Sequence, residues 1–361
     1  MTIDDKVAQW VRPEIRAINA YHVPNPGNLI KLDAMENPYH WPEEMVQEWL
    51  ALLGQTQVNR YPDPAARALT AELRKAMDVP EEMGVLLGNG SDEIIQILAL
   101  ALGGEGRAVL APEPGFVMYR MIATFSGMSY IGVPLREDFS LDLPAMLEAI
   151  KQHDPAVIYL AYPNNPTGNL FDESEMEAVI RAANGLVVVD EAYHAFAGKS
   201  FMARLGEFDN LLVMRTVSKL GLAGLGLGLL AGPQAWLNEF DKVRLPYNIN
   251  VLTQASAEFA LRHLAVFDEQ TRRIREERTR LMAEMTKLDG ITVYPSAANF
   301  ILFRTLAGRA DDVFEGIRQA GVLIKNMKAT NGPLADCLRV TVGTPIENDA
   351  FLAALRKALA R

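Results

Sequence analysis

The most informative residues of the chain are a lysine and an aspartate that each follow a short apolar run. Lys219 stands just before a glycine-rich segment, and Asp190 closes the run Val187-Val188-Val189. A lysine amine can form a Schiff base with an aldehyde, and a carboxylate can keep a ring nitrogen protonated. Pyridoxal phosphate chemistry requires both groups, so the pair predicts a site for that cofactor.

A glycine-containing turn, Gly88-Asn89-Gly90-Ser91-Asp92-Glu93, lies between an apolar strand pattern and an apolar-periodic helix. Ser91 is a good N-cap, and the free N–H groups at a helix start form a ready site for a phosphate. A capped helix after a turn explains this segment equally well when it is taken alone. Beside a candidate Schiff-base lysine, the phosphate interpretation is favoured.

A second turn, Tyr162-Pro163-Asn164-Asn165-Pro166-Thr167-Gly168, follows another predicted strand. Asn-Pro and Thr-Gly pairs form turns anyway, but two prolines that bracket two asparagines also fix their side chains. Asn165 could then donate a hydrogen bond to an anionic ring oxygen. Tyr193, three residues after Asp190, could reach the same ring hydroxyl.

The elements that must position these residues alternate between strands and helices. Seven apolar runs are predicted strands: Gly84–Leu87, Ala108–Ala111, Met128–Val133, Ala156–Ala161, Leu186–Val189, Leu211–Thr216 and Gly226–Ala231. Helical patterns separate them at Asp92–Leu102, Phe116–Ser126, Leu143–Gln152 and Glu173–Ala182. The alternation predicts an α/β fold with a mostly parallel sheet and helices on both faces. Ligands of such sheets gather at the carboxyl ends of the strands.

The chain is predicted to have three parts. Residues 1–30 form an N-terminal amphipathic helix (Val7–Ala20) and a Pro/Gly-rich arm, which we expect to pack across another surface. Residues 31–250 form a large cofactor-binding domain, and residues 251–361 a smaller C-terminal α/β domain. A long charged helix at about 266–288 joins the two domains.

Composition narrows the class of protein. The 361 residues carry a net charge of -10, which argues against a nucleic acid partner. No run of 18 apolar residues is present, and the first residues do not have the pattern of a signal peptide, so no membrane partner is expected. The single Cys337 fits a reducing compartment, and the scattered histidines predict no metal site. We therefore expect a cytoplasmic enzyme.

The order and spacing of these segments resemble those of fold-type-I, pyridoxal-phosphate-dependent aminotransferases, and more narrowly of the histidinol-phosphate aminotransferase family. The resemblance covers the chain from about Tyr21 to Thr344. Its matching segments are Met35–Tyr39, Asn59–Asp63, Gly88–Glu93, Pro114–Tyr119, Asn164–Gly168, Asp190–Tyr193, Arg215–Leu225, Leu245–Asn250 and Cys337–Thr344.

The resemblance implies a role for each matching residue. The resemblance implies three catalytic residues, which are Lys219, Asp190 and Tyr193. Lys219 forms the Schiff base, and Asp190 pairs with the pyridine nitrogen. Asn165 and Tyr193 hold the ring oxygen, Phe116 stacks on the ring, and Ser91, Asp92 and Ser218 lie at the cofactor phosphate. Tyr61 reaches the cofactor phosphate of the neighbouring subunit, which implies a homodimer with shared active sites. Arg339, Asn37, Lys325 and Tyr21 bind substrate, the last two at its phosphate.

The implied reaction is transamination of histidinol phosphate with 2-oxoglutarate in histidine biosynthesis, with imidazole acetol phosphate and glutamate as the other pair. Two positions depart from the family pattern. Gly226 stands where an arginine usually contacts the cofactor phosphate, and Lys325 stands where arginine is common at the substrate phosphate. Loss of a charge-assisted contact to phosphate would weaken cofactor binding by about 1.5–3 kcal/mol.

Four alternatives stay open on the sequence alone. An aromatic amino-acid aminotransferase of the same fold would share every cofactor residue, and a phosphothreonine decarboxylase would share the fold. A nucleotide-binding dehydrogenase is poorly supported, because the glycines around Gly224 do not form a Gly-x-Gly-x-x-Gly turn that opens a helix. A cofactor-binding protein without turnover remains conceivable because of Gly226. His194 is interpreted as a packing residue.

Overall fold

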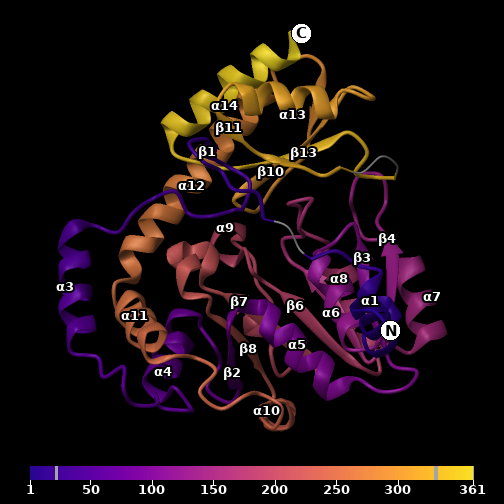
Figure 1. Ribbon diagram of the computed structural model, residues 1–361, viewed down its shortest axis with the longest axis vertical. Helices are drawn as coiled ribbons and strands as arrows, with labels where there is room; N and C mark the ends of the chain where they lie inside the picture. The colour runs from indigo at the N-terminus through magenta and orange to yellow at the C-terminus, as the bar shows by residue number, and fades with distance from the viewer. Residues whose placement is uncertain (21–22, 329–331, 361) are drawn as a thin grey trace.

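The body of the protein is built on a seven-stranded sheet with the order β2-β8-β7-β6-β5-β3-β4 (Figure 1). The computed structural model describes residues 1–20, 23–328 and 332–360. The strands are β2 (Gly84–Gly88), β3 (Ala108–Glu113), β4 (Ser129–Pro134), β5 (Val157–Ala161), β6 (Leu186–Asp190), β7 (Leu211–Thr216) and β8 (Gly228–Gly232). Strand β8 is antiparallel to both neighbours, and the other pairs are parallel. The predicted α/β class is confirmed, and each predicted strand lies within two residues of an observed one.

Both faces of this sheet are covered by helices, because successive residues of a strand point to opposite faces. In β6, Val187 and Val189 belong to one apolar core, whereas Leu186 and Val188 belong to another. The first core includes residues of α4 (Arg67–Ala76), α7 (Leu143–His153), α8 (Glu173–Ala182) and α11 (Val251–Arg262). The second includes residues of α5 (Gly90–Leu102), α6 (Val117–Phe125) and α10 (Gln234–Asp241). Alternate residues of a strand therefore pack into different cores on the two faces of the sheet.

A second, smaller sheet with the order β12-β13-β10-β9 lies at the other end of the molecule (Figure 1). Its elements are β9 (Ile291–Val293), β10 (Phe300–Thr305), α13 (Ala310–Gln319), β12 (Lys325–Asn326), β13 (Cys337–Thr341) and α14 (Pro345–Leu359). This part has a core of its own, to which Phe303, Val313 and Leu355 contribute. In addition, β1 (Ile30–Lys31) pairs with β11 (Val322–Leu323), which ties the segment after the N-terminal arm to this part. The division at residues 30 and 250 stays a prediction.

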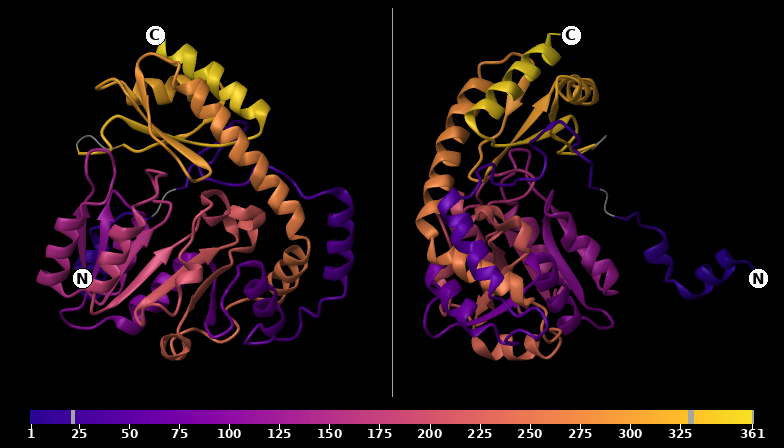
Figure 2. Two further views of the ribbon diagram at one scale, coloured as in Figure 1. Left: turned by 180° about the vertical axis from the view of Figure 1, so that it is seen from behind. Right: turned by 60° about the vertical axis from the view of Figure 1, so that its left-hand side comes forward.

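The long helix α12 (Leu264–Met285) runs along one side of the molecule between the two sheets (Figures 1 and 2). Phe267, Ile274 and Leu281 are buried on its inner side. Ion pairs such as Arg272–Glu269, at 2.7 Å, lie on its exposed side, as the alternating charges predict. Among the described residues, no helix is both long enough and apolar enough to pass through a membrane.

The N-terminal segment differs from its prediction. Instead of one helix over Val7–Ala20, the structure has α1 (Ile3–Trp10) and a short α2 (Pro13–Arg16). Thr2 and Asp5 form a capping box that fixes the earlier start. The break lies before Pro13, which has no N–H to continue the first helix and favours the first position of the next one. Helix α2 contacts α6, whereas α1 extends away from the body (Figure 2) and has no buried residue.

Two further helices pack against the helices that follow the large sheet. Helix α3 (Glu43–Gly54) lies at the outer edge of the molecule (Figure 1) and contacts α11. The short α9 (His194–Ala197) follows Asp190 closely and contacts α12. The segment that leaves β6 is therefore held against the helix that connects the two sheets.

Candidate active site

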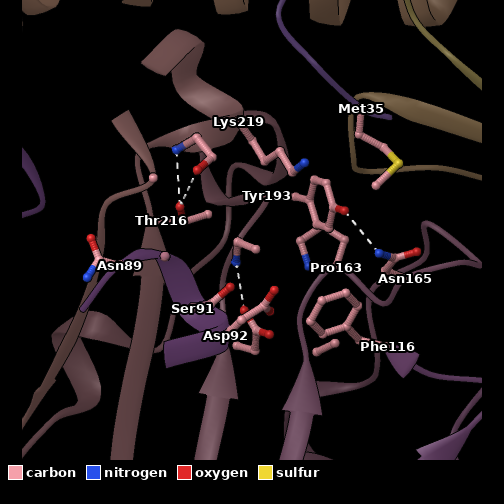
Figure 3. A pocket seen from close by; sticks show the side chains of 16 residues that line it. Met35, Asn89, Ser91, Asp92, Phe116, Pro163, Asn165, Tyr193, Thr216 and Lys219 are labelled. Carbon is pink, nitrogen blue, oxygen red and sulfur yellow. Dashed lines mark hydrogen bonds between the residues drawn. The ribbon is translucent and has the colours of Figure 1, made fainter. Parts of the chain in front are cut away.

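A cavity of about 300 Å³ lies at the carboxyl ends of β5, β6 and β7 and the start of α5. This is the edge at which open α/β sheets bind ligands. Every residue predicted to bind the cofactor within one chain lines it: Ser91, Asp92, Phe116, Asn165, Asp190, Tyr193, Ser218 and Lys219. Met35, Asn89, Pro163, Thr216 and Gly226 are among its other lining residues (Figure 3).

Lys219 extends into the cavity from the short π-helical segment Ser218–Leu222 that follows β7. Its Nζ donates a hydrogen bond to the backbone oxygen of Ala34 at 3.2 Å. Burial, with the charge of Arg339 nearby, lowers the pKa of Lys219 to about 8. The folded protein thus makes the neutral amine, which is the form that attacks a carbonyl carbon, much more abundant near neutral pH than it is for an ordinary lysine.

Asn37, predicted to bind substrate, lies behind the segment that carries Lys219. Its Nδ2 donates to the backbone oxygen of Leu220 at 2.8 Å and to Oε1 of Gln270 at 2.9 Å. Gly221 has a φ of 135°, and a Cβ there would lie 2.9 Å from Asn37 Nδ2. In this structure Asn37 therefore supports the lysine segment and is not among the residues that line the cavity.

Asp190 ends β6 and is 4% exposed. Its Oδ2 accepts a hydrogen bond from the Tyr119 hydroxyl at 2.6 Å, and its Oδ1 accepts one from the Ala192 N–H at 3.1 Å. Burial raises the pKa of Asp190 to about 6, although the hydrogen bond from Tyr119 opposes that rise. Among the described residues no cationic side chain forms an ion pair with it. A buried carboxylate of this kind requires a cation from a ligand.

The next residue, Glu191, points to the opposite face of the sheet and is fully buried. Arg215, at the end of β7, lies 2.8 Å from its carboxylate and also donates to the Met77 backbone oxygen at 2.8 Å. Our sequence analysis missed this pair. A signal was present, because a second acid after Asp190 in a buried run requires a cation near the end of a neighbouring strand.

A chain of hydrogen bonds joins the two sheets beside the cavity. Asn165 donates to the Tyr193 hydroxyl at 3.1 Å (Figure 3), and Arg339 of β13 donates to Asn165 Oδ1 at 2.6 Å. Lys325 is the direct cross-strand neighbour of Arg339. Burial and the charge of Arg339 lower the pKa of Lys325. The two cations form a basic region where an anionic substrate would be attracted.

The opposite end of the cavity is formed by the turn between β2 and α5. Asn89 precedes the helix without a side-chain cap, so the first N–H groups of α5 stay available to a ligand. A Cβ on Gly228 would lie 2.7 Å from the Gly90 carbonyl carbon, so this glycine lets β8 contact the turn directly. Burial raises the pKa of Asp92, and Lys219 opposes that rise.

Tyr61, Lys325 and His194 do not line this cavity. Tyr61 is 81% exposed and stacks on Tyr247 with ring centroids 4.5 Å apart. Lys325 is next to Arg339 and is not among the lining residues. Tyr21 lies outside the described residues. His194 begins α9, with Nδ1 3.2 Å from the Glu191 backbone oxygen, and burial lowers its pKa to about 3.

The residues present fit pyridoxal phosphate. Asp190 can face a protonated ring nitrogen, the Asn165–Tyr193 pair a ring oxygen, and Lys219 an aldehyde. The start of α5, with Ser91 and Ser218, can hold a phosphate. The fit rests above all on the buried Asp190 carboxylate, because no described side chain supplies the cation that it requires.

Comparisons with known proteins agree with this assignment. The family described as aminotransferase class I and II matches residues 27–355. Histidinol-phosphate aminotransferase 2 of Nitrosococcus oceani is 59% identical and covers 98% of both chains. Histidinol-phosphate aminotransferase of Chromobacterium violaceum is 53% identical, over 97% of this chain and 98% of the relative. The crystal structure of a Sinorhizobium meliloti histidinol-phosphate aminotransferase in complex with pyridoxal-5'-phosphate has a TM-score of 0.87 at 23% identity, covering 98% of each chain.

The lowered pKa of Lys219 predicts unusual reactivity in the cofactor-free protein. Trace acetylation followed by peptide mass spectrometry should show that the acetylation rate of Lys219 reaches half its maximum near pH 8. For an ordinary lysine this midpoint lies at about pH 10.4. Lys199 is the internal control, because its bond to Glu173 raises its pKa. Equal midpoints for the two lysines would contradict the proposed environment of Lys219.

Proposed function

The chain belongs to the class I and II aminotransferases, and we propose that it catalyses transamination of histidinol phosphate with 2-oxoglutarate in histidine biosynthesis. Pyridoxal 5'-phosphate is its cofactor. The observation that supports this most strongly is the cavity that both Lys219 and Asp190 line, where no described side chain provides a cation for the carboxylate. The choice of substrate is supported by relatives of 47–59% identity that are histidinol-phosphate aminotransferases over their full length.

When bound, pyridoxal phosphate supplies an aldehyde that exchanges amines and a ring that accepts the electrons of the substrate Cα–H bond. Lys219 would hold the aldehyde until the amino donor replaces it. With a pKa of about 8, the freed lysine amine is partly neutral near neutral pH, and in that form it would accept the proton from Cα and donate it to the former aldehyde carbon. Asp190 would keep a proton on the ring nitrogen, and Asn165 with Tyr193 would hold the ring oxygen.

The substrate's anionic end is bound by the basic region of the small sheet. Arg339 lies on β13 and is fixed toward the cavity by its bond to Asn165. Lys325 stands directly across from it and adds a second positive charge. A lysine gives a point charge and no planar fork, so it accepts a phosphate without strict geometry. The same region must accept histidinol phosphate in one half-reaction and the carboxylate of glutamate in the other.

The alternatives from the sequence are not favoured. A phosphothreonine decarboxylase from Porphyromonas gingivalis has a TM-score of 0.79, but at 23% identity that likeness concerns the fold alone. An aromatic aminotransferase would share the cofactor residues and would have no need for the second cation, Lys325. The dehydrogenase hypothesis fails because residues 27–355 match the aminotransferase family. We also propose a cytoplasmic location, which the single Cys337 supports.

The direct test is an absorbance spectrum of the holoenzyme. The visible band of the bound cofactor should disappear on addition of histidinol phosphate and return with 2-oxoglutarate, and the Lys219→Ala variant should not turn over. A band that responds to phenylalanine and not to histidinol phosphate would contradict the proposed substrate. Release of carbon dioxide from phosphothreonine would instead identify a decarboxylase.

Gly226 should weaken the hold on the cofactor phosphate. It lines the cavity at a φ of 51°, and nothing lies within 4 Å of where its Cβ would be. Lys219 is the one cationic side chain among the described lining residues. The Gly226→Arg variant should therefore bind pyridoxal phosphate at least about tenfold more tightly, measured by fluorescence titration of the cofactor-free protein.

The matched control is Gly226→Ala, which has the same backbone strain and no charge. Its affinity for the cofactor should stay close to that of the parent protein. If Gly226→Arg also binds the cofactor no more tightly, the assembled enzyme already supplies a cation to the phosphate from elsewhere, and Gly226 is not a weak point.

We propose that the enzyme is a homodimer with shared active sites. Tyr61, Val58 and Leu245 are between 70% and 81% exposed, and Ile3 and Trp10 of α1 are similarly uncovered. Large apolar side chains in such numbers are typical of a surface that a partner covers. A second copy of this chain would cover them and bring Tyr61 to the neighbouring cofactor phosphate.

Mixing two defective variants tests this arrangement. Lys219→Ala and Tyr61→Ala homodimers should each be impaired, whereas a mixed dimer has one site with the intact Lys219 of one chain and the intact Tyr61 of the other. Activity should therefore recover after subunit exchange. Exchange without recovery, or a mass of one chain by sedimentation, would contradict the shared site.

A further inference from the structure

Tyr119 makes a direct contact with Asp190 from outside the sheet. It lies on α6, is 2% exposed, and donates its hydroxyl to Asp190 Oδ2 at 2.6 Å. Since the Ala192 N–H binds the other carboxylate oxygen, both oxygens have a fixed donor. The carboxylate thus has one defined orientation before any ligand is present.

The ring of Tyr119 is held as firmly as its hydroxyl. It stacks on Tyr159 of β5 with centroids 4.5 Å apart and an angle of 6° between the planes. On another side Phe116, which lines the cavity, meets it edge-on at 5.5 Å. Tyr119 therefore connects the aromatic side chain at the cavity with the carboxylate at the end of β6.

The surroundings of Asp190 do not favour its ionised form. Asp92 from α5 and Glu191 from its own strand add negative charge, and burial acts in the same direction. Among the described groups that act on it, the hydroxyl of Tyr119 and the Ala192 N–H oppose these effects. Burial and the charge of Asp190 raise the pKa of Tyr119 far above its ordinary value, so its hydroxyl remains a donor.

We propose that Tyr119 is a positioning residue for Asp190, whose hydroxyl keeps the carboxylate ionised and directed toward the ring nitrogen of the cofactor. Without the Tyr119 hydroxyl, the Asp190 carboxylate would compete more strongly with the ring nitrogen for the proton that lies between them. The ring nitrogen would then carry less positive charge and accept electrons less well. The role at the ring rests on the proposed function, whereas the effect on Asp190 does not.

The structure also provides a matched control. Tyr159 is buried beside Tyr119 and carries the same hydroxyl, yet that hydroxyl has no hydrogen-bond partner among the described residues. Tyr119→Phe and Tyr159→Phe each remove one oxygen from the same aromatic stack. They differ in whether Asp190 loses a donor.

The first experiment titrates the cofactor-free, full-length protein by ¹³C NMR of labelled aspartate carboxyls, with Asp190→Asn to assign the signal. The midpoint of Asp190 should rise by about one pH unit or more in Tyr119→Phe and stay unchanged in Tyr159→Phe. An unchanged midpoint in Tyr119→Phe, or equal rises in both variants, would overturn the proposal.

The second experiment follows the pH dependence of the cofactor band in the holoenzyme. In Tyr119→Phe the pH midpoint of the change in the band should rise. A cofactor ring with less positive charge makes the nitrogen contributed by Lys219 easier to protonate. The turnover number should fall about tenfold with an unchanged KM for histidinol phosphate. A rise in KM alone would overturn the positioning role.

The two experiments distinguish a failure of the proposed function from a failure of the proposed role of Tyr119. If no protein shows a cofactor band, the proposed function fails while the carboxyl titration still tests Tyr119. If Tyr119→Phe does not fold, 3-fluorotyrosine at position 119 serves in its place. Its more acidic hydroxyl is a stronger donor and should lower the Asp190 midpoint, and a rise or no change would contradict the inference.

Discussion

The structure depends most on one constraint, a carboxylate buried at the end of a parallel strand. Asp190 lies at the carboxyl end of β6, where burial raises its pKa to about 6, and no described cation neutralises it. A protein retains such a group at a cost to its stability, and the cost is offset when a ligand brings the missing charge. We propose that the protonated ring nitrogen of pyridoxal phosphate is that charge and that Lys219, which lines the same cavity, anchors the same ligand.

The alternation of side chains along β6 separates two kinds of acid. Asp190 shares a face with Val188 and opens to the cavity between α5 and α6, whereas Glu191 points to the other face and pairs with Arg215. Asp190 has no cation among the described side chains and is available to a ligand, whereas the carboxylate of Glu191 is paired with Arg215 and hydrogen-bonded to Ser200 and Phe201. A shift of one residue in strand register would exchange these roles. The strongly apolar strands that fix the register are therefore part of the site.

The strands and the residues that line the cavity could be predicted from the sequence because each depends on local signals, and the family followed from the order and spacing of segments along nearly the whole chain. Lys219, Asp190 and Asn165 follow apolar runs or lie between prolines, and parallel strands bring their ends together. The bond between Tyr119 and Asp190 could not be predicted, because it joins residues 71 positions apart on a helix and a strand. The place of Tyr61 depends on a second chain. The helix break before Pro13 was available in the sequence, and our prediction missed it.

We propose that Asp190 holds a proton on the ring nitrogen of the cofactor. The decisive measurement is the ¹⁵N chemical shift of ring-labelled pyridoxal phosphate bound to the parent protein and to Asp190→Asn. We expect a protonated ring nitrogen in the parent protein and an unprotonated one in the variant at the same pH. The same shift in both proteins would contradict it, because the buried carboxylate would then have no part in the state of the cofactor.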